Sequence, residues 1–247
     1  MIGLSLGHES RQGHHLGYVK FDHAKTDRQN PATKQLRELA KFADQDVVFL
    51  AGSTQPGEEA MAIEIFSALV EKYPALRLVL VPRHPERFEE VAQLLAKQGV
   101  AFSRRSRLPQ EDASESRVLL VDVVGELGAW WGTAQIAFVG GSMGNRGGQN
   151  MIEPAAYGAA VSFGPNTWNF RDIVALLRGR DAAVVVRDQA ELTQFVTRCL
   201  EEPAFAEELG QRAQSLVLEQ LGAADRTIDL LGKLLPSKKR FFRRFAA

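Results

Sequence analysis

Three glycine breaks fall within one stretch of the sequence, Ile136 to Phe170. The apolar run Ile136–Val139 is typical of a buried strand, and Gly140-Gly141-Ser142 follows it directly. The pairs Gly147-Gly148 and Gly164-Pro165 are the second and third breaks. Glycine lets the backbone approach a ligand closely, because no Cβ stands in the way. One such pair is also typical of a tight turn that binds nothing, but three breaks with polar residues between them favour a ligand-binding edge.

Polar residues precede a short predicted helix inside this stretch. Gln149 and Asn150 lead into a helical pattern from Met151 to Ala156, with Glu153 in its first turn. The first N–H groups of a helix have no partner within the helix, and they attract a phosphate or a carboxylate. The stretch therefore predicts an anion site here, with Asn150 and Glu153 as candidate contact residues.

Earlier turns add side chains of the same chemical kind. Arg83 can pair with a phosphate through a planar fork, while Ser53 and glycine N–H groups cradle its remaining oxygens. His84 can donate to a phosphate or steady a leaving group. Because parallel strands end at one edge of a sheet, we expect the turns after successive strands to converge. These turns are Gly52-Ser53-Thr54, Arg83-His84, Gly125-Glu126-Leu127, Gly140-Gly141-Ser142 and Gly164-Pro165.

The acidic residues allow two interpretations. Glu126 or Glu153 can accept hydrogen bonds from ribose hydroxyls, as an acidic residue does in dinucleotide-binding folds. Glu126 can equally cap the helix that follows it. The residues alone leave both roles open.

Elements that position these residues follow from alternating apolar runs and helical patterns. We predict strands at Val47–Ala51, Leu76–Val81, Gly99–Ser103, Arg117–Val121, Ile136–Val139, Ala159–Phe163 and Ala182–Val186. We predict helices at Ala32–Phe42, Gly57–Lys72, Phe88–Gln98, around Trp130 and Trp131, from Phe170 to about Arg178, and at Gln189–Leu200, Ala204–Leu221 and Ala223–Leu235. This alternation predicts the α/β class, as a single doubly wound, Rossmann-like parallel sheet with helices at its C-terminal end.

The two ends of the chain carry weaker patterns. Residues 1–16 read as an irregular lead-in, and a short strand is expected near Gly17 to Phe21. His8, His14 and His15 lack matching carboxylates or cysteines, so no metal site is expected. The tail, residues 236–247, mixes cations with aromatic residues, which suits either contact with a membrane surface or a frayed basic end.

Composition excludes several classes of protein. The 247 residues are 45% apolar with formal net charge zero, so nothing in the charge indicates a nucleic-acid partner. The single cysteine, Cys199, indicates a reducing compartment without disulfides and reads as a buried apolar residue. No apolar run reaches the roughly 18 residues that span a bilayer, and no signal-peptide core is visible. Absence of the phosphate loop, the dinucleotide fingerprint and the nucleophile turn disfavours ATPases, dehydrogenases and α/β-hydrolases.

From about Gly17 to Leu235 the chain resembles the C-terminal, nucleotide-sugar-binding half of the 3-deoxy-D-manno-octulosonic acid (Kdo) transferases. The motifs that carry the resemblance are Ala51-Gly52-Ser53-Thr54 with Gly57-Glu58-Glu59, Val81 through Phe88, Gly125 through Gly128, Phe138 through Ser142, Arg146-Gly147-Gly148, and Asn150 through Ala155. Their order and spacing are highly specific to that family.

The resemblance implies a GT-B glycosyltransferase whose C-terminal half, residues 17–235 here, binds CMP-Kdo. The family is inverting, uses no bound metal or other cofactor, and transfers Kdo to a lipid A precursor in lipopolysaccharide biosynthesis at the cytoplasmic face of the inner membrane. Carried onto this sequence, the donor site would be lined by Ser53, Arg83, His84, Gly125, Glu126, Leu127, Gly141, Ser142, Asn150 and Glu153.

Departures from the family leave alternatives open. The catalytic base is expected in an N-terminal acceptor domain that this chain lacks, and the last helices are expected to expose the apolar patch that would pack on it. Gln55, Gln149 and Asn166 stand where the family usually has histidine, and Trp131 where tyrosine is common. A non-catalytic nucleotide-binding module is therefore the alternative function. A transferase using another nucleotide sugar fits Pro82-Arg83-His84-Pro85 less well.

Overall fold

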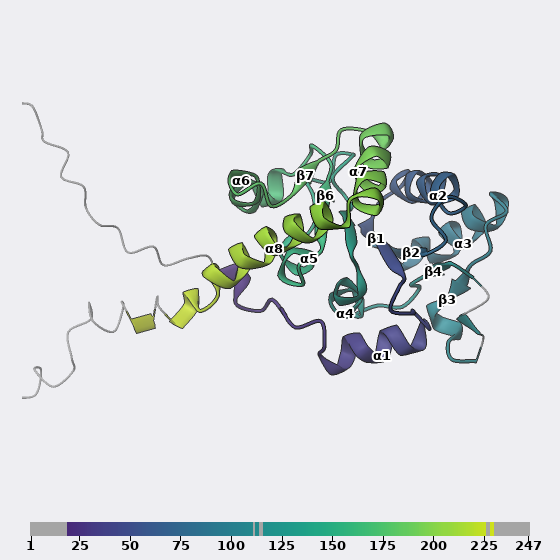
Figure 1. Ribbon diagram of the computed structural model, residues 1–247, viewed down its shortest axis with the longest axis horizontal. Helices are drawn as coiled ribbons and strands as arrows, with labels where there is room; N and C mark the ends of the chain where they lie inside the picture. Colours follow the sequence, from purple (N-terminus) through teal and green to yellow (C-terminus); the bar gives the residue numbers. More distant parts are fainter. Residues whose placement is uncertain (1–18, 111, 114–115, 226–227, 230–247) are drawn as a thin grey trace, which may run out of the picture. The chain divides into compact units, whose positions relative to one another are not determined.

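The computed structural model describes residues 19–110, 112–113, 116–225 and 228–229 (Figure 1). They form two compact units: Ala24–Glu219, and a smaller unit made of the described residues among 1–23 and 220–247. The larger unit carries the sheet and every candidate site residue. The predicted lead-in and tail, with the three early histidines, lie outside the described residues, so the predicted boundaries of the domain stay predictions.

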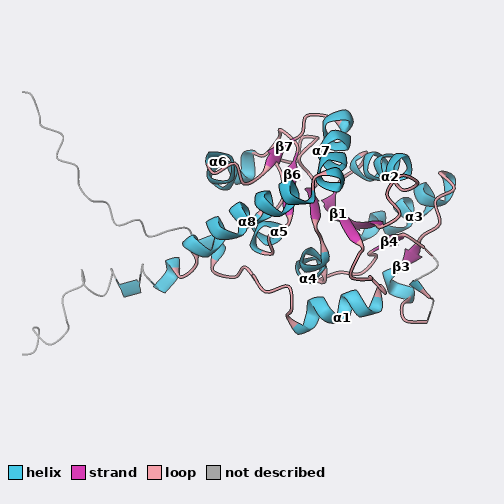
Figure 2. Ribbon diagram, in the orientation of Figure 1, coloured by secondary structure: helices cyan, strands magenta, loops and turns pink. Residues whose placement is uncertain are grey.

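Seven parallel strands make one sheet in the order β3-β4-β2-β1-β5-β6-β7 (Figure 2). The strands are β1 (Val47–Thr54), β2 (Leu76–Pro82), β3 (Ser103–Arg104), β4 (Val118–Leu120), β5 (Ile136–Val139), β6 (Ala160–Phe163) and β7 (Val184–Val185). The parallel α/β sheet predicted from the alternating pattern is confirmed.

Helices connect the strands and cover both faces of the sheet. They are α1 (Pro31–Leu39), α2 (Glu58–Leu69), α3 (Phe88–Lys97), α4 (Leu127–Trp130), α5 (Ile152–Ala156), α6 (Arg171–Gly179), α7 (Gln189–Glu201) and α8 (Pro203–Gln220). Short 3-10 turns are η1 (Val19–Phe21), η2 (Pro85–Arg87), η3 (Arg105–Arg107), η5 (Trp131–Thr133) and η6 (Trp168–Phe170). In Figure 1, α2 and α7 lie on one side of the sheet, and α1 and α4 on the other.

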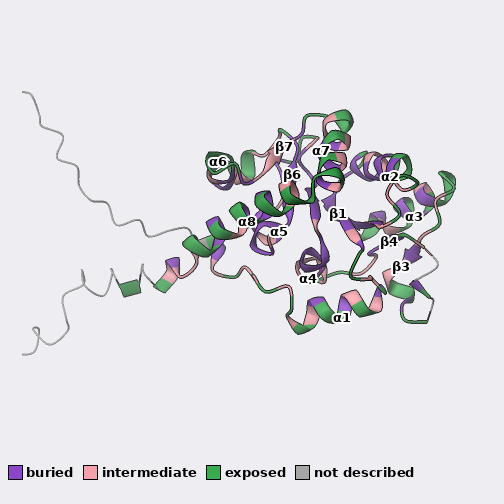
Figure 3. Ribbon diagram, in the orientation of Figure 1, coloured by how far each residue is buried: buried purple, intermediate pink, exposed green. Residues whose placement is uncertain are grey.

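The core lies between the sheet and the helices α2, α3 and α7. Phe49 of β1 and Phe138 of β5 pack there with Ile63 of α2, Leu95 of α3 and Phe195 of α7. The alternate residues of the same strands are equally buried on the opposite face, so the central strands are covered on both sides (Figure 3). Burial on both faces explains why these strands read as continuous apolar runs rather than alternating ones.

Helix α1 begins where its sequence signals predict. Pro31 occupies the first helical position, where its missing N–H costs nothing. Asn30 caps the helix, because its side-chain oxygen accepts from the backbone N–H of Thr33 at 3.0 Å.

Strand β1 is longer than predicted. It was expected to end at Ala51, but it continues through Gly52-Ser53-Thr54, with an irregularity in its pairing to β2 between Gly52 and Thr54. Ser53 has φ of 55°, in the left-handed region that non-glycine residues seldom adopt. The predicted turn is thus a distorted strand end.

Two other strand predictions are wrong. The strand expected at 99–103 is only Ser103–Arg104 (β3). Gly99, at φ 70°, terminates α3 before the strand can begin, and β3 lies at the edge of the sheet, where it pairs with β4. Residues 19–21 form the 3-10 turn η1 instead of part of a strand, and they pair with none of the seven strands.

No helix among the described residues is long and apolar enough to cross a bilayer. Along α8 the exposed large apolar side chain is Leu218. The last predicted helix, residues 223–235, lies mostly outside the described residues, so the expected apolar patch stays a prediction.

Candidate functional site

The order of the strands reverses between β1 and β5. Strands β2, β3 and β4 all lie on one side of β1, whereas β5, β6 and β7 lie on its other side. Ligands of open α/β sheets bind in the crevice beyond the strand ends at such a switch point. The loops after β1, β2 and β5 meet there, as the sequence predicts.

A buried carboxylate, that of Glu58 in the first turn of α2, holds the loops after β1 and β5 together. Its oxygens accept backbone N–H bonds from Gln55 at 2.8 Å, Gly141 at 2.7 Å, Ser142 at 3.1 Å and Met143 at 3.0 Å. Glu58 is only 3% exposed. The protein thus supplies its own anion to the glycine loop, and the amides predicted to cradle a phosphate already have a partner.

Ser142 and Gly140 shape this loop from within. The Ser142 hydroxyl donates to the carbonyl of Val139 at 2.6 Å and accepts from the N–H of Gly164 at 2.7 Å, and the residue is fully buried. At Gly140 an added Cβ would lie 2.7 Å from the Glu58 carboxylate and from the carbonyl of Ser53. These residues join the ends of β5, β6 and β1, so we assign Ser142 a structural role in the described state.

Arg83, by contrast, has an unengaged side chain. It is exposed, and its backbone N–H donates to the carbonyl of Thr54 at 3.1 Å, which anchors the residue beside the end of β1. Its guanidinium forms no hydrogen bond or ion pair with the part of the chain that the structure describes. A cation anchored at the sheet edge and left without a partner is suited to an anionic ligand.

Asn150 and Glu153 form a local pair at the start of α5. The Asn150 oxygen accepts from the N–H of Ile152 and its amide donates to Glu153, both at 3.0 Å. Burial raises the pKa of the Glu153 carboxyl, while the bond from Asn150 and the charge of Arg83 act in the opposite direction. The predicted anion seat at this helix is therefore partly filled by Asn150, and Glu153 lies within electrostatic range of Arg83.

Glu126 has partners that neither predicted role included. Its carboxylate accepts two bonds from Arg105, at 2.8 and 2.6 Å, and a third from the indole N–H of Trp130 at 3.1 Å. Its side chain makes no capping bond to α4, so the capping interpretation is wrong. The ribose role stays a prediction, and any hydroxyl would share the carboxylate with Arg105.

The turn from Gly125 into α4 packs against Gly52 of β1. Gly125 has φ of 90°, which lets the chain reverse before Leu127. A Cβ on Gly52 would meet the ring of Trp131 at 2.5 Å and the side chain of Leu127 at 3.0 Å. Leu127 therefore packs on the strand end, and Gly52 is required by this close contact.

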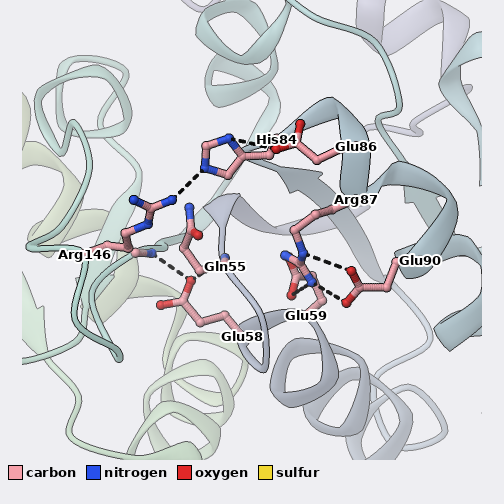
Figure 4. A network of polar contacts seen from close by, with 9 residues as sticks. Gln55, Glu58, Glu59, His84, Glu86, Arg87, Glu90 and Arg146 are labelled. Atoms are coloured by element: carbon pink, nitrogen blue, oxygen red, sulfur yellow. Dashed lines mark hydrogen bonds and ion pairs between the residues drawn. The ribbon is translucent and has the colours of Figure 1, made fainter.

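Residues from three loops meet beside Arg83 in a cluster that was predicted only in part (Figure 4). Arg146 Nη2 lies 3.3 Å from His84 Nε2, and the buried amide of Gln55 points toward both. His84 was predicted as a site residue. Arg146 was noted among the glycine breaks, and Gln55 only as a departure from the family.

An ion pair that the sequence reasoning missed supports this cluster. Arg87 of η2 donates to both oxygens of Glu59 in α2, at 2.6 and 3.2 Å, and also pairs with Glu90 (Figure 4). The Glu59 side chain is 1% exposed and that of Arg87 11%. The pair fixes the turn that carries His84 onto α2.

Asn166 and Gln149, two further departures from the family pattern, both contact the glycine loop after β5. The Asn166 amide donates to the carbonyl of Met143 at 2.9 Å, which ties the β5 and β6 loops together. Gln149 packs over Gly141, where an added Cβ would lie 3.1 Å from it. Within the described ranges, no group of three or more His, Cys, Asp or Glu residues could hold a metal ion.

Solved structures with a similar fold include glycosyltransferases. WaaG, a glycosyltransferase involved in lipopolysaccharide biosynthesis, superposes with a TM-score of 0.55 at 14% identity, over 84% of this chain and 54% of that one. The chain therefore has the α/β fold that occurs in GT-B glycosyltransferases.

Closer relatives define the family. The chain is 30% identical to the C-terminal CMP-Kdo binding domain of WaaA from Acinetobacter baumannii, with a TM-score of 0.70 over 75% of this chain and 97% of that one. It is 38% identical over 231 residues to the 3-deoxy-D-manno-octulosonic acid transferase of Haemophilus influenzae and 36% over 218 residues to that of Bordetella pertussis. The chain belongs to the Kdo transferase family.

These alignments cover 92% and 87% of this chain, but 53% and 50% of the relatives. The chain thus spans about half the length of the curated relatives it matches. No family model matches the chain.

Proposed function

We propose that this chain is the donor-binding part of an inverting glycosyltransferase that transfers Kdo from CMP-Kdo to a lipid A precursor. The observation that carries the proposal is the 97% coverage, at 30% identity, of a solved domain described as CMP-Kdo binding. The unengaged guanidinium of Arg83 at the switch-point edge supports it, because the nucleotide phosphate needs a cation there.

In this proposal Arg83 binds the phosphate of the donor. An acceptor hydroxyl attacks the anomeric carbon, the bond from that carbon to the phosphate oxygen breaks, and CMP leaves with the bonding electrons. Arg83 stabilises the negative charge that grows on the phosphate. The hydroxyl proton passes to a general base, which the family resemblance assigns to an acceptor domain.

The Glu58 carboxylate restricts how the phosphate can be held. Because Glu58 occupies the N–H groups of Gly141 and Ser142, those residues serve the proposed site by shaping it. The phosphate then depends on side chains at the ends of β1 and β2, chiefly Arg83 with Ser53. Glu153 and Asn150 remain candidates for the ribose, on the side of Arg83 toward α5.

The proposed reaction takes place at a membrane surface. A lipid A precursor as acceptor implies work at the cytoplasmic face of the inner membrane, with the donor arriving from the cytoplasm. Residues 236–247 lie outside the described structure, so membrane contact through this basic and aromatic tail stays a prediction.

Calorimetric titration with CMP, using UMP and UDP as controls, tests the donor site. We expect selective binding of CMP, and the Arg83→Ala variant should bind it about 1.5–3 kcal/mol more weakly, the scale of a hydrogen bond to a charged group. Arg178→Ala, at an exposed position on α6, is the matched control and should bind like the parent chain. Equal affinity for all three nucleotides, or unchanged affinity in Arg83→Ala, would contradict the proposal.

A further inference from the structure

Three polar side chains from separate loops converge at the crevice. Gln55 follows β1, His84 follows β2, and Arg146 belongs to the glycine loop after β5. The guanidinium Nη2 of Arg146 lies 3.3 Å from Nε2 of His84. A guanidinium can only donate, so Nε2 of His84 is the acceptor in this contact. Figure 4 shows the Gln55 side chain directed toward these two residues.

The Gln55 amide is a buried donor without an acceptor. Gln55 is 8% exposed, and its Nε2 has no hydrogen-bond partner among the residues that the structure describes. Buried polar atoms are nearly always paired, so an orphaned donor is a sign of a missing partner. The missing partner must be an acceptor, and it must lie close to a guanidinium.

Nearby carboxylates do not neutralise the cluster. Glu58 lies below Gln55, but four backbone N–H groups occupy its oxygens. Glu86 reaches no closer than 3.8 Å to Nδ1 of His84 and its side chain is 75% exposed. Arg146 forms no ion pair with any residue that the structure describes. The cluster therefore keeps a positive charge and an unused donor, which together suit an anion.

This cluster is distinct from the position of Arg83. His84 has an extended backbone, with φ of −116° and ψ of 126°, and neighbouring residues of an extended chain point to opposite sides. His84 accordingly meets Arg146, whereas the charge of Arg83 acts on Glu153. The two cationic positions thus belong to the same strand end but face opposite sides of its backbone.

We propose that Arg146, His84 and Gln55 form a second anion subsite, which binds the carboxylate of the donor sugar while Arg83 binds the phosphate. The inference rests on the proposed function and deepens it. Kdo is a sugar acid whose carboxylate is attached to the same anomeric carbon that carries the phosphate oxygen. Two anions on one carbon suit a strand end that offers a cation on each side of its backbone. Binding the phosphate and the carboxylate together fixes the position of the anomeric carbon that carries them. A nucleotide sugar that lacks the carboxylate would leave the cluster of Arg146, His84 and Gln55 without an anion.

Titration of each variant with both CMP and freshly prepared CMP-Kdo tests the subsite. Arg146→Ala should bind CMP like the parent chain but CMP-Kdo roughly tenfold to a hundredfold more weakly, the range for one lost charged contact. Gln55→Leu should act in the same direction with a smaller loss. Arg83→Ala should weaken both ligands. Arg146 is exposed, so its removal should leave thermal unfolding unchanged, and this is measured in parallel.

The possible outcomes separate the two proposals. If the parent chain binds neither ligand, the proposed function fails and the subsite fails with it. If the parent chain binds both but Arg146→Ala weakens CMP and CMP-Kdo equally, or weakens neither, the donor site stands and the carboxylate subsite is overturned. Selective loss of CMP-Kdo supports it, and partial recovery in Arg146→Lys would identify the charge as the source.

Discussion

The carboxylate of Glu58 lies 2.7 Å from the backbone nitrogen of Gly141 and accepts its hydrogen bond, although Glu58 begins the helix that follows β1 and Gly141 lies in the loop that follows β5. Glu58 comes directly after β1, whereas Gly141 comes directly after β5. One side chain therefore joins the two halves of the sheet at the point where the topology leaves a crevice.

Removing that side chain should destabilise the fold strongly. Glu58→Ala leaves four backbone N–H groups without their acceptor in a buried loop, and each unsatisfied group costs about 1–3 kcal/mol. We expect a loss of at least about 3 kcal/mol in the free energy of unfolding, measured by urea denaturation. Glu64→Ala on the exposed face of the same helix is the control and should change little. A loss in Glu58→Ala no greater than in the control would show that the carboxylate does not hold the loop.

The contact between Gly52 and Trp131 predicts a steric cost at the end of β1. Gly52→Ala would bring a methyl group within 2.6 Å of the indole ring, so we expect about 1–3 kcal/mol of destabilisation from overpacking. Thermal unfolding measures this loss. Gly144→Ala, where an added Cβ meets nothing within 4 Å, is the matched control. The smaller ring of Trp131→Phe should make the Gly52→Ala change less costly, and strictly additive effects would argue against the contact.

Replacing one residue of the buried ion pair between Arg87 and Glu59 should lower the free energy of unfolding more than replacing both. Arg87→Ala leaves the Glu59 carboxylate buried without a cation, which typically costs about 3–5 kcal/mol. Converting both residues, as in Glu59→Gln with Arg87→Met, should recover much of that stability. Arg187→Ala, which breaks an exposed pair with Glu191, is the control and should have a small effect. A double variant as unstable as Arg87→Ala would refute this account.

Cys199 predicts a dependence of stability on alkaline pH. Burial raises the pKa of its thiol from 9.0 to about 12. The unfolded chain therefore loses this proton at a lower pH than the folded chain, so the cysteine's contribution to stability declines as pH rises above 9.0. Cys199→Ala should show a shallower decline over this range in urea titrations, and parallel curves for the two proteins would contradict the assignment. At pH 8 the native thiol should also react slowly with a disulfide reagent and rapidly once unfolded.

Much of the fold follows from local pattern. Continuous apolar runs such as Ile136–Val139 predicted strands buried on both faces, and Pro31 marked the start of α1 correctly. Strand lengths were predicted less well at the edges and ends of the sheet. The end of β1 depends on Gly52 fitting beneath Trp131, a contact between residues far apart in sequence.

The candidate site was predictable as a set of loops but not as a set of contacts. Gly141 and Arg83 were placed at the correct sheet edge, because parallel strands fix which turns converge. Nothing in the spacing indicates that Glu58 would occupy the amide of Gly141, since the acidic first turn of α2 has a sufficient local explanation in the helix dipole. The capping role of Glu126 was wrong for a related reason, because its partner Arg105 lies in the short 3-10 turn η3, which the sequence does not signal by periodicity.

The Glu58 contacts also bear on how a ligand is captured. A loop whose amides are already held has little conformational freedom left to lose when a nucleotide arrives. In the proposed donor site, the glycines after β5 therefore form a rigid backbone surface, despite a composition that suggests mobility. The entropy lost in ordering the protein on capture should then come mainly from long exposed side chains such as Arg83, and the backbone beneath them should contribute almost none of it.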